Sequence, residues 1–390
     1  MKIEVNTHER CMLDFANKHP ETLVLSADLG TSCEVKKFRA EKPDQYLTMG
    51  IAEQNMCSWA AGLAREGYRP FLHTFSVFLS RRILDQVEMS VAYPNLPVTF
   101  VGFVPGITTP GGVTHQSIND VGIMRTVPNM AIFDVGDATD IEGVLDLAYE
   151  WNGPAYIRML RKEVPRLFPA NEPMVFNRAR TITEGDDVLI LSSSICTEEA
   201  MRATAALEDK GVSVQHMHVS TLKPFTDPTI VEALKKCKYG VVTMENHYNI
   251  GGLGSAVADL MAENGIGKKL IKIGLNGYAH GASKMYLMTK YGIDAMLAQT
   301  DPYTEYYPEE DNTLKEMTSG KFGGIGSVIR YYTPRKRVAI IEPSEGSPAA
   351  EIGLKAGDII MEINGKDMAQ GDRIPNDLTS YVSDNLRGEP

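Results

Sequence analysis

The chain has 390 residues, a formal net charge of −11, and 43% hydrophobic against 23% charged residues. This balance is ordinary for a globular protein of about two to four domains. The acidic charge argues against binding to nucleic acid or to an anionic membrane surface. No apolar run reaches the roughly 18 residues that a transmembrane helix needs. The five cysteines form no CxxC pair and the start shows no signal-peptide pattern, so we expect a reduced, cytoplasmic protein without disulfides or a thiolate metal site.

The first segment, residues 1–165, alternates short apolar runs with helix-like stretches. The runs at 22–29, 97–104 and 130–136 are apolar along most of their length, as are strands of a parallel sheet that is covered on both faces. Residues 51–66 are rich in alanine and other small residues and predict one closely packed helix. The alternation predicts an α/β domain.

A second α/β unit is expected after a linker. Residues 164–174 hold three prolines and no helical period, so we predict an inter-domain linker over 166–185. The apolar run at 186–194 then opens a segment with the order strand, helix, strand, helix, strand. That order predicts a second parallel sheet over 186–296.

The last segment, 297–390, changes from the helical to the alternating strand period. Residues 302–311 are acidic and aromatic, and residues 323–366 alternate as β-strands do. We therefore expect a separate small β module there.

The first group of candidate site residues is Glu53, Phe75 and Phe78. Glu53 lies at the start of the small-residue helix, and the two phenylalanines follow about one helix length later. A carboxyl group beside aromatic rings can hold a flat heteroaromatic ligand, because the rings stack on its face while the acid bonds a ring nitrogen. The same pattern also fits a helix-start glutamate above core phenylalanines, which is the commoner arrangement.

The second group consists of a histidine and two arginines. His115 lies in a glycine-rich loop, where an imidazole can bond a substrate hydroxyl or move a proton; the alternative is a histidine packed against its own turn. Arg158 and Arg161 follow a strand-like start, where a guanidinium can hold a phosphate, or they belong to a surface charge run. The GGLGS string at 251–255 suggests an anion site or, more often, a packing turn.

Taken together, residues 1 to about 294 resemble the C-terminal two-thirds of transketolases and of the related 1-deoxy-xylulose-5-phosphate synthases. The resemblance implies a thiamine-diphosphate pyrimidine domain followed by a transketolase C-terminal domain. The matching strings occur in the family order: SADLGTS (26–32), GIAEQNM (50–56), SVFLSRRILDQV (76–87), GGVTHQ (111–116), DVGIMRTVPNM (120–130) and MENHYNIGGLGSAVA (244–258).

The resemblance implies an enzyme that uses thiamine diphosphate to transfer a two-carbon ketol unit from a ketose or its phosphate to an aldose or its phosphate. In the family, the glutamate matching Glu53 bonds N1′ of the aminopyrimidine and promotes loss of the proton at C2. By the same match Phe75 and Phe78 belong to the cofactor pocket, and Leu29 packs under the bent middle of the cofactor.

The resemblance also implies substrate contacts. His115 matches a residue at the upper hydroxyls or carbonyl of the sugar, and Ser32 and Arg161 match residues at its phosphate. Two positions depart from the family pattern: Gly111 stands where an aspartate usually reads a substrate hydroxyl, and His8 stands where a phosphate-binding arginine is expected. Both changes leave room for a modified sugar or a different polar tail.

The family's site for the diphosphate and Mg²⁺, a GDG motif with a downstream asparagine, is absent from this sequence. The strings at 136–138, 185–187 and 357–359 lack the last glycine. We therefore expect one subunit of a split transketolase, with no metal ligands of its own and inactive alone. An N-terminal partner subunit would hold the diphosphate and Mg²⁺, and two copies of each chain would form a heterotetramer.

Three alternatives remain open. The first is an enzyme like 1-deoxy-xylulose-5-phosphate synthase, the second is the β subunit of a 2-oxo-acid dehydrogenase, and the third is a non-catalytic PDZ-linked scaffold. The third arises because residues 301–330 and 345–366 resemble the start of a carboxy-terminal processing peptidase and its PDZ domain. The peptidase core and the closing PDZ strands are missing, so we expect an incomplete module that binds no peptide, joined near 291–308 as a fusion or assembly artefact.

Overall fold

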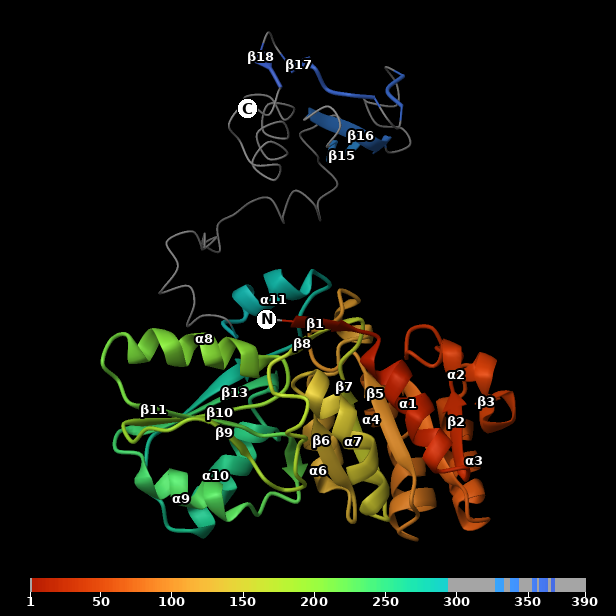
Figure 1. The fold of residues 1–390 in the computed structure, drawn as a ribbon, viewed down its shortest axis with the longest axis vertical. Helices are drawn as coiled ribbons and strands as arrows, with labels where there is room; N and C mark the ends of the chain where they lie inside the picture. The colour runs from red at the N-terminus through yellow and green to blue at the C-terminus, as the bar shows by residue number, and fades with distance from the viewer. Residues whose placement is uncertain are drawn as a thin grey trace. The chain divides into compact units, whose positions relative to one another are not determined.

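The computed structural model describes residues 2–293, 327–332, 337–343, 353–355, 358–363 and 366–368. The chain divides into two compact units, Met1–Glu305 and Tyr306–Pro390 (Figure 1). Of the helices in the described ranges, none is long and apolar enough to cross a membrane.

A seven-stranded sheet forms the centre of the first α/β domain, with the strand order β12-β6-β7-β5-β4-β2-β3. Every neighbouring pair is parallel except β12 with β6. The central strands are buried almost throughout, which is why most of their residues are apolar. The strands are β2 (Thr22–Ser26), β3 (Tyr46–Thr48), β4 (Arg69–Phe75), β5 (Thr99–Phe103), β6 (Ala131–Asp134), β7 (Ala155–Met159) and β12 (Thr221–Lys223).

Helices cover both faces of this sheet. Successive strand residues point to opposite faces, so Leu25 and Leu72 pack with helix α3, while Val24 and Phe71 pack with α1 and α7. The predicted α/β class is thereby confirmed. The helices of this domain are α1 (Thr7–Lys18), α2 (Lys36–Glu41), η1 (Pro43–Gln45), α3 (Glu53–Arg65), α4 (Ser76–Ser80), α5 (Leu84–Gln86), the π-helical η2 (Val87–Ala92), η3 (Gly112–Thr114), α6 (Asp120–Thr126) and α7 (Ala138–Glu150).

A five-stranded sheet forms the second α/β domain, in the order β14-β13-β10-β11-β9, with only β9 antiparallel to its neighbour. Helix α8 packs on one face, and α9 and α10 pack on the other (Figure 1). The elements are β9 (Arg180–Thr183), β10 (Val188–Ser192), α8 (Cys196–Glu208), β11 (Val214–His218), α9 (Pro228–Lys236), β13 (Gly240–Tyr248), α10 (Leu253–Glu263), β14 (Leu270–Leu275) and α11 (Lys284–Lys290).

The two α/β domains are joined by a strand that crosses between them. Strand β12 comes from the second segment of the chain but pairs with β6 of the first sheet. Strand β9 lies inside 166–185, the stretch predicted to be a linker, and joins the second sheet. A separate antiparallel pair links β1 (Lys2–Val5) to β8 (Glu163–Arg166).

The described residues of the last segment form two short antiparallel pairs. Strand β15 (Ser327–Tyr332) pairs with β16 (Arg337–Pro343), and β17 (Glu362–Ile363) pairs with β18 (Lys366–Asp367). These pairs agree with the alternation predicted for 323–366. The acidic stretch 302–311 and residues 294–308 of the predicted join lie outside the described residues.

Candidate active site

The site begins at Glu53, the first residue of α3. Gly50, with a φ of 70°, turns the chain out of β3 towards this helix. Glu53 then lies in the first helical turn, where the free backbone N–H groups favour a negative charge. Its side chain is 2% exposed, and its Oε2 accepts a hydrogen bond of 2.8 Å from Nη1 of Arg82. Within residues 2–293 no other hydrogen-bond partner of this carboxylate is found.

Two phenylalanine rings lie next to the Arg82 guanidinium that bonds this carboxylate. Phe75 ends β4 and Phe78 lies in α4 directly after it. The two rings are stacked, with centroids 5.9 Å apart and planes 24° apart. The Arg82 guanidinium lies over the Phe78 ring, 4.1 Å from its centroid. Glu53, Arg82 and Phe78 are therefore in one continuous line of contacts.

His115 follows η3 and meets both rings edge-on. Its ring centroid lies 6.0 Å from that of Phe75 and 5.8 Å from that of Phe78. Its Nδ1 is 2.9 Å from Oγ1 of Thr114. The half-buried imidazole therefore has one nitrogen engaged by its own loop, while Nε2 is left for another partner.

Arg161 lies near the Phe75 ring. Its guanidinium lies 5.5 Å from the Phe75 ring centroid, and its Nη1 donates a 3.0 Å hydrogen bond to the carbonyl oxygen of Ser32. Leu29 packs against the core cluster that includes Phe75. The structure thus places Arg161, bonded to the Ser32 carbonyl, near the Phe75 ring that His115 also meets.

Three other sequence candidates lie away from these rings. Arg158 is completely buried, so neither the phosphate site nor the surface charge run predicted for it is correct. His8 is also completely buried, with its Nε2 3.0 Å from Nε2 of His73, so it does not take the place of an exposed phosphate-binding arginine. At GGLGS, the N–H groups of Leu253 and Gly254 donate to the Glu245 carboxylate, which favours the packing turn over an anion site.

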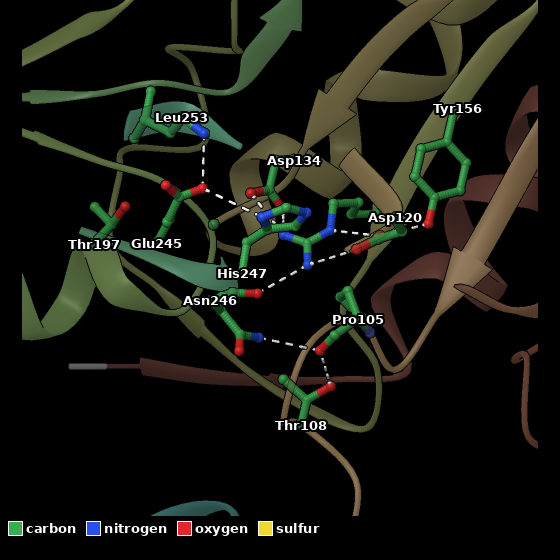
Figure 2. A network of polar contacts seen from close by, with 12 residues as sticks. Pro105, Thr108, Asp120, Asp134, Tyr156, Thr197, Glu245, Asn246, His247 and Leu253 are labelled. Atoms are coloured by element: carbon green, nitrogen blue, oxygen red, sulfur yellow. Dashed lines mark hydrogen bonds and ion pairs between the residues drawn. The ribbon is translucent and has the colours of Figure 1, made fainter. Parts of the chain in front are cut away.

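A buried polar network surrounds Arg158. Its Nε and Nη1 pair with Asp120 and Asp134 at 2.8 and 3.0 Å, and its Nη2 donates to the Asn246 carbonyl at 2.9 Å. The Tyr156 hydroxyl donates to Asp120 at 2.7 Å. Burial raises the pKa of Asp134, and the Arg158 charge opposes that rise. Figure 2 shows that the network joins the first sheet to the end of β13 in the second domain.

Two residues that now matter were missed in the sequence. Arg82 lies within the SVFLSRRILDQV string, four positions after Phe78, and that spacing was the available signal. Asn246 lies within MENHYNIGGLGSAVA, and no local pattern distinguished it because its partners are about 140 positions away.

The side chains present fit an aminopyrimidine ring. The guanidinium of Arg82 is flat, carries N–H donors, and contacts the Glu53 carboxylate and the face of Phe78 at the same time. An aminopyrimidine offers the same flat shape and polar edge. Within the described ranges, no group of three or more His, Cys, Asp or Glu side chains is placed to hold a metal ion.

Comparisons with known families define the class of these domains. Residues 6–166 match the family described as transketolase, pyrimidine binding domain, and residues 177–295 match transketolase, C-terminal domain. Both α/β domains are thus of the kind found in thiamine-diphosphate enzymes. A PDZ domain family matches residues 340–382, in agreement with the resemblance noted for the tail.

Relatives identify the family. A 6-deoxy-6-sulfo-D-fructose transketolase subunit from Clostridium sp. is 37% identical over 292 residues, which cover 74% of this chain and 90% of that protein. One of the subunits of an apulose-4-phosphate transketolase from Actinobacillus succinogenes is 32% identical over 272 residues, covering 69% and 87%. A solved structure described as a split gene transketolase, inactive beta4 tetramer, has a TM-score of 0.69 and 33% identity over 75% of this chain and 96% of that one. The chain belongs to the transketolase family, and these relatives are named as transketolase subunits or as the product of a split gene.

Proposed function

We propose that this chain is the pyrimidine-domain subunit of a split transketolase, which moves a two-carbon ketol unit between sugars. The observation that carries this proposal is the Glu53 carboxylate, which is 2% exposed and is bonded by Arg82, whose guanidinium lies over the face of Phe78. Thiamine diphosphate, when bound, supplies the nucleophilic carbon and the electron sink that carbon–carbon cleavage needs.

The residues of this chain would hold and orient the reactants. Glu53 would bond the pyrimidine ring nitrogen and move a proton at that atom, after Arg82 releases the carboxylate. Phe78 would form an apolar wall on the side where Arg82 now lies. His115, with Nδ1 engaged by Thr114, presents Nε2 to a sugar hydroxyl or carbonyl.

We further propose that the active site is completed by a partner subunit that binds the diphosphate and Mg²⁺. Two features support this: the sequence lacks the GDG motif, and a structural relative made of similar chains alone is described as inactive. That relative is a tetramer, which supports self-association of this type of chain. We expect two copies of each subunit in the active complex.

The proposed substrate is a ketose with an anionic tail, either a phosphate or a sulfonate. Arg161 supplies a cation whose direction is set by the Ser32 carbonyl and the Phe75 ring. A Cβ atom at Gly111 would lie 2.8 Å from Cβ of His115, so an aspartate there would displace the imidazole. The sulfosugar transketolase subunit among the relatives makes a sulfonate a natural first substrate to test.

Reconstitution tests the proposal. The chain is mixed with an N-terminal transketolase subunit that carries the GDG motif, thiamine diphosphate and Mg²⁺, and sugar products are measured alongside C2 proton exchange of the cofactor. We expect turnover only with both chains, and a loss of about 100-fold or more in Glu53→Gln. Thr31→Ala, an exposed neighbour of Ser32, serves as a surface control.

Other outcomes favour the alternatives. Decarboxylation of pyruvate in place of ketose cleavage would indicate a synthase-like or 2-oxo-acid dehydrogenase activity. Turnover by the chain alone would refute the need for a partner. Absence of C2 exchange in the complete complex would favour a non-catalytic scaffold.

A further inference from the structure

We propose that the C-terminal domain takes part in catalysis through Asn246, which positions the loop 105–117 that carries His115. The inference rests on the proposed function in so far as His115 contacts substrate. Asn246 itself touches no reacting atom; it is a positioning residue that acts through the backbone of that loop.

Both polar atoms of the Asn246 side chain form hydrogen bonds to the loop backbone. Its Oδ1 accepts the N–H of Ile107 at 3.0 Å, and its Nδ2 donates to the carbonyl of Pro105 at 3.1 Å. The Thr108 hydroxyl donates to the same carbonyl at 2.8 Å. Figure 2 shows the amide of Asn246 pointing at Pro105 from the end of β13. Because the side chain is fully buried, water cannot replace these bonds without opening the domain boundary.

The end of the loop that Asn246 holds is also bonded to the loop's other end. The N–H of Gly106 donates to the carbonyl of Ser117 at 2.8 Å, so the residues that Asn246 bonds are tied to the chain that leaves the loop. Gly106 has a φ of 58°, and a Cβ built there would lie 2.2 Å from Oδ1 of Asn246. Only glycine lets the amide reach the backbone at this point.

The C-terminal domain also touches the loop near its tip. The Gln116 side chain donates to the loop carbonyl of Thr109 at 2.9 Å and reaches the carbonyl of His280 at 3.5 Å. A Cβ at Gly112 would lie 3.2 Å from the backbone nitrogen of Gly281. The second domain therefore contacts the loop at residues 105–107 and again at Gly112 and Gln116, on either side of His115 in the sequence.

Asn246 is in turn fixed from the first domain. Its carbonyl accepts Nη2 of Arg158 at 2.9 Å, and Arg158 is held by Asp120 and Asp134. The residue is thus anchored by its backbone to the first sheet and by its amide to the loop. This second layer of contacts is what keeps a reacting side chain within the small error that catalysis tolerates.

The first test uses hydrogen–deuterium exchange and needs no activity. Asn246→Ala is compared with Asn249→Ala, a control in which the lost amide bonds Gly274 and Asn276 and not the loop. We expect exchange in peptides covering 105–117 to rise by roughly threefold or more in Asn246→Ala, with other peptides unchanged, and no rise there in the control. Unchanged exchange in 105–117, or an equal rise throughout the chain, would overturn the inference.

The second test uses the reconstituted complex. We expect Asn246→Ala to lower kcat by about 10- to 100-fold with a small change in KM, because the loop carries His115 while Arg161 still holds the tail. Gly106→Ala, which approaches the same contact from the loop side, should do the same. In the double variant the two losses should multiply only in part, because the clash with the amide is gone while the strain of alanine at a φ of 58° remains. Losses that multiply in full would refute a shared contact.

The two proposals fail separately. If the reconstituted complex shows no ketol transfer, the proposed function is wrong. The hydrogen–deuterium exchange experiment still reports whether Asn246 holds the loop.

Discussion

Replacing Arg158 with methionine should destabilise the chain by about 3–5 kcal/mol, because the substitution leaves Asp120 and Asp134 buried without their cation. All three side chains are completely buried, so water cannot screen the two carboxylates. Methionine fills much of the arginine's volume with a flexible chain, so the loss would reflect charge more than a cavity. A change of this size corresponds to a fall in Tm on the order of 10 °C.

The assay is urea unfolding followed by far-UV circular dichroism, together with calorimetric Tm. Arg10→Met is the matched control, because Arg10 also pairs with an acid, Glu142, but its side chain is 55% exposed. Exposed pairs contribute about 0–1 kcal/mol. Adding Asp120→Asn and Asp134→Asn to Arg158→Met should recover part of the loss. If Arg158→Met lies within about 1 kcal/mol of Arg10→Met, the account of uncompensated buried charge is wrong.

Three further predictions concern the site and its pH dependence. Arg82→Met should tighten cofactor binding to the reconstituted complex by about two- to fivefold, measured by titration calorimetry. The reason is that Arg82 competes with the cofactor for Glu53 through a half-exposed ion pair. Weaker binding would mean that Arg82 assists the cofactor. Arg161→Met should raise KM for an anionic sugar by about tenfold or more but leave KM for a neutral sugar unchanged, in steady-state assays. Burial raises the pKa of Glu245 from 4.5 to about 7, so the folded chain holds a proton that the unfolded chain releases, and this contribution to stability falls as pH rises through that window. Between about pH 5 and pH 7, the free energy of unfolding should therefore fall less in Glu245→Gln than in wild type, by up to roughly 3 kcal/mol in unfolding titrations. If the free energy of unfolding changes with pH equally in both proteins, the pKa shift assigned to Glu245 is wrong.

Local sequence pattern was enough to predict the elements that matter most. The apolar runs at 22–29, 97–104 and 130–136 contain β2, β5 and β6, and the small-residue stretch 51–66 contains α3. Strands buried on both faces are mostly apolar, so their signal is local and strong. The pairing of β12 with β6 in the first sheet has no such signal, because it joins residues about 90 positions apart in the sequence.

The residues of the candidate site divide in the same way. Glu53, Phe78 and His115 could be named from the sequence because each lies in a short string whose order resembles the transketolase family. The sequence did not show that His115 meets the stacked pair of Phe75 and Phe78, or that Arg82 bonds the Glu53 carboxylate. Both contacts became visible only in the folded structure.

By itself, the sequence determined the α/β class, the family and the residue types available for chemistry, since these depend on composition, periodicity and short strings. The tertiary structure alone decided which charges are buried and which loop is held by which domain. Arg158 shows why: in the sequence it resembles Arg161, three positions away, yet one is completely buried among carboxylates and the other reaches the ring of Phe75. Burial and pairing set the free energy of a charge, and both depend on neighbours that are distant along the chain.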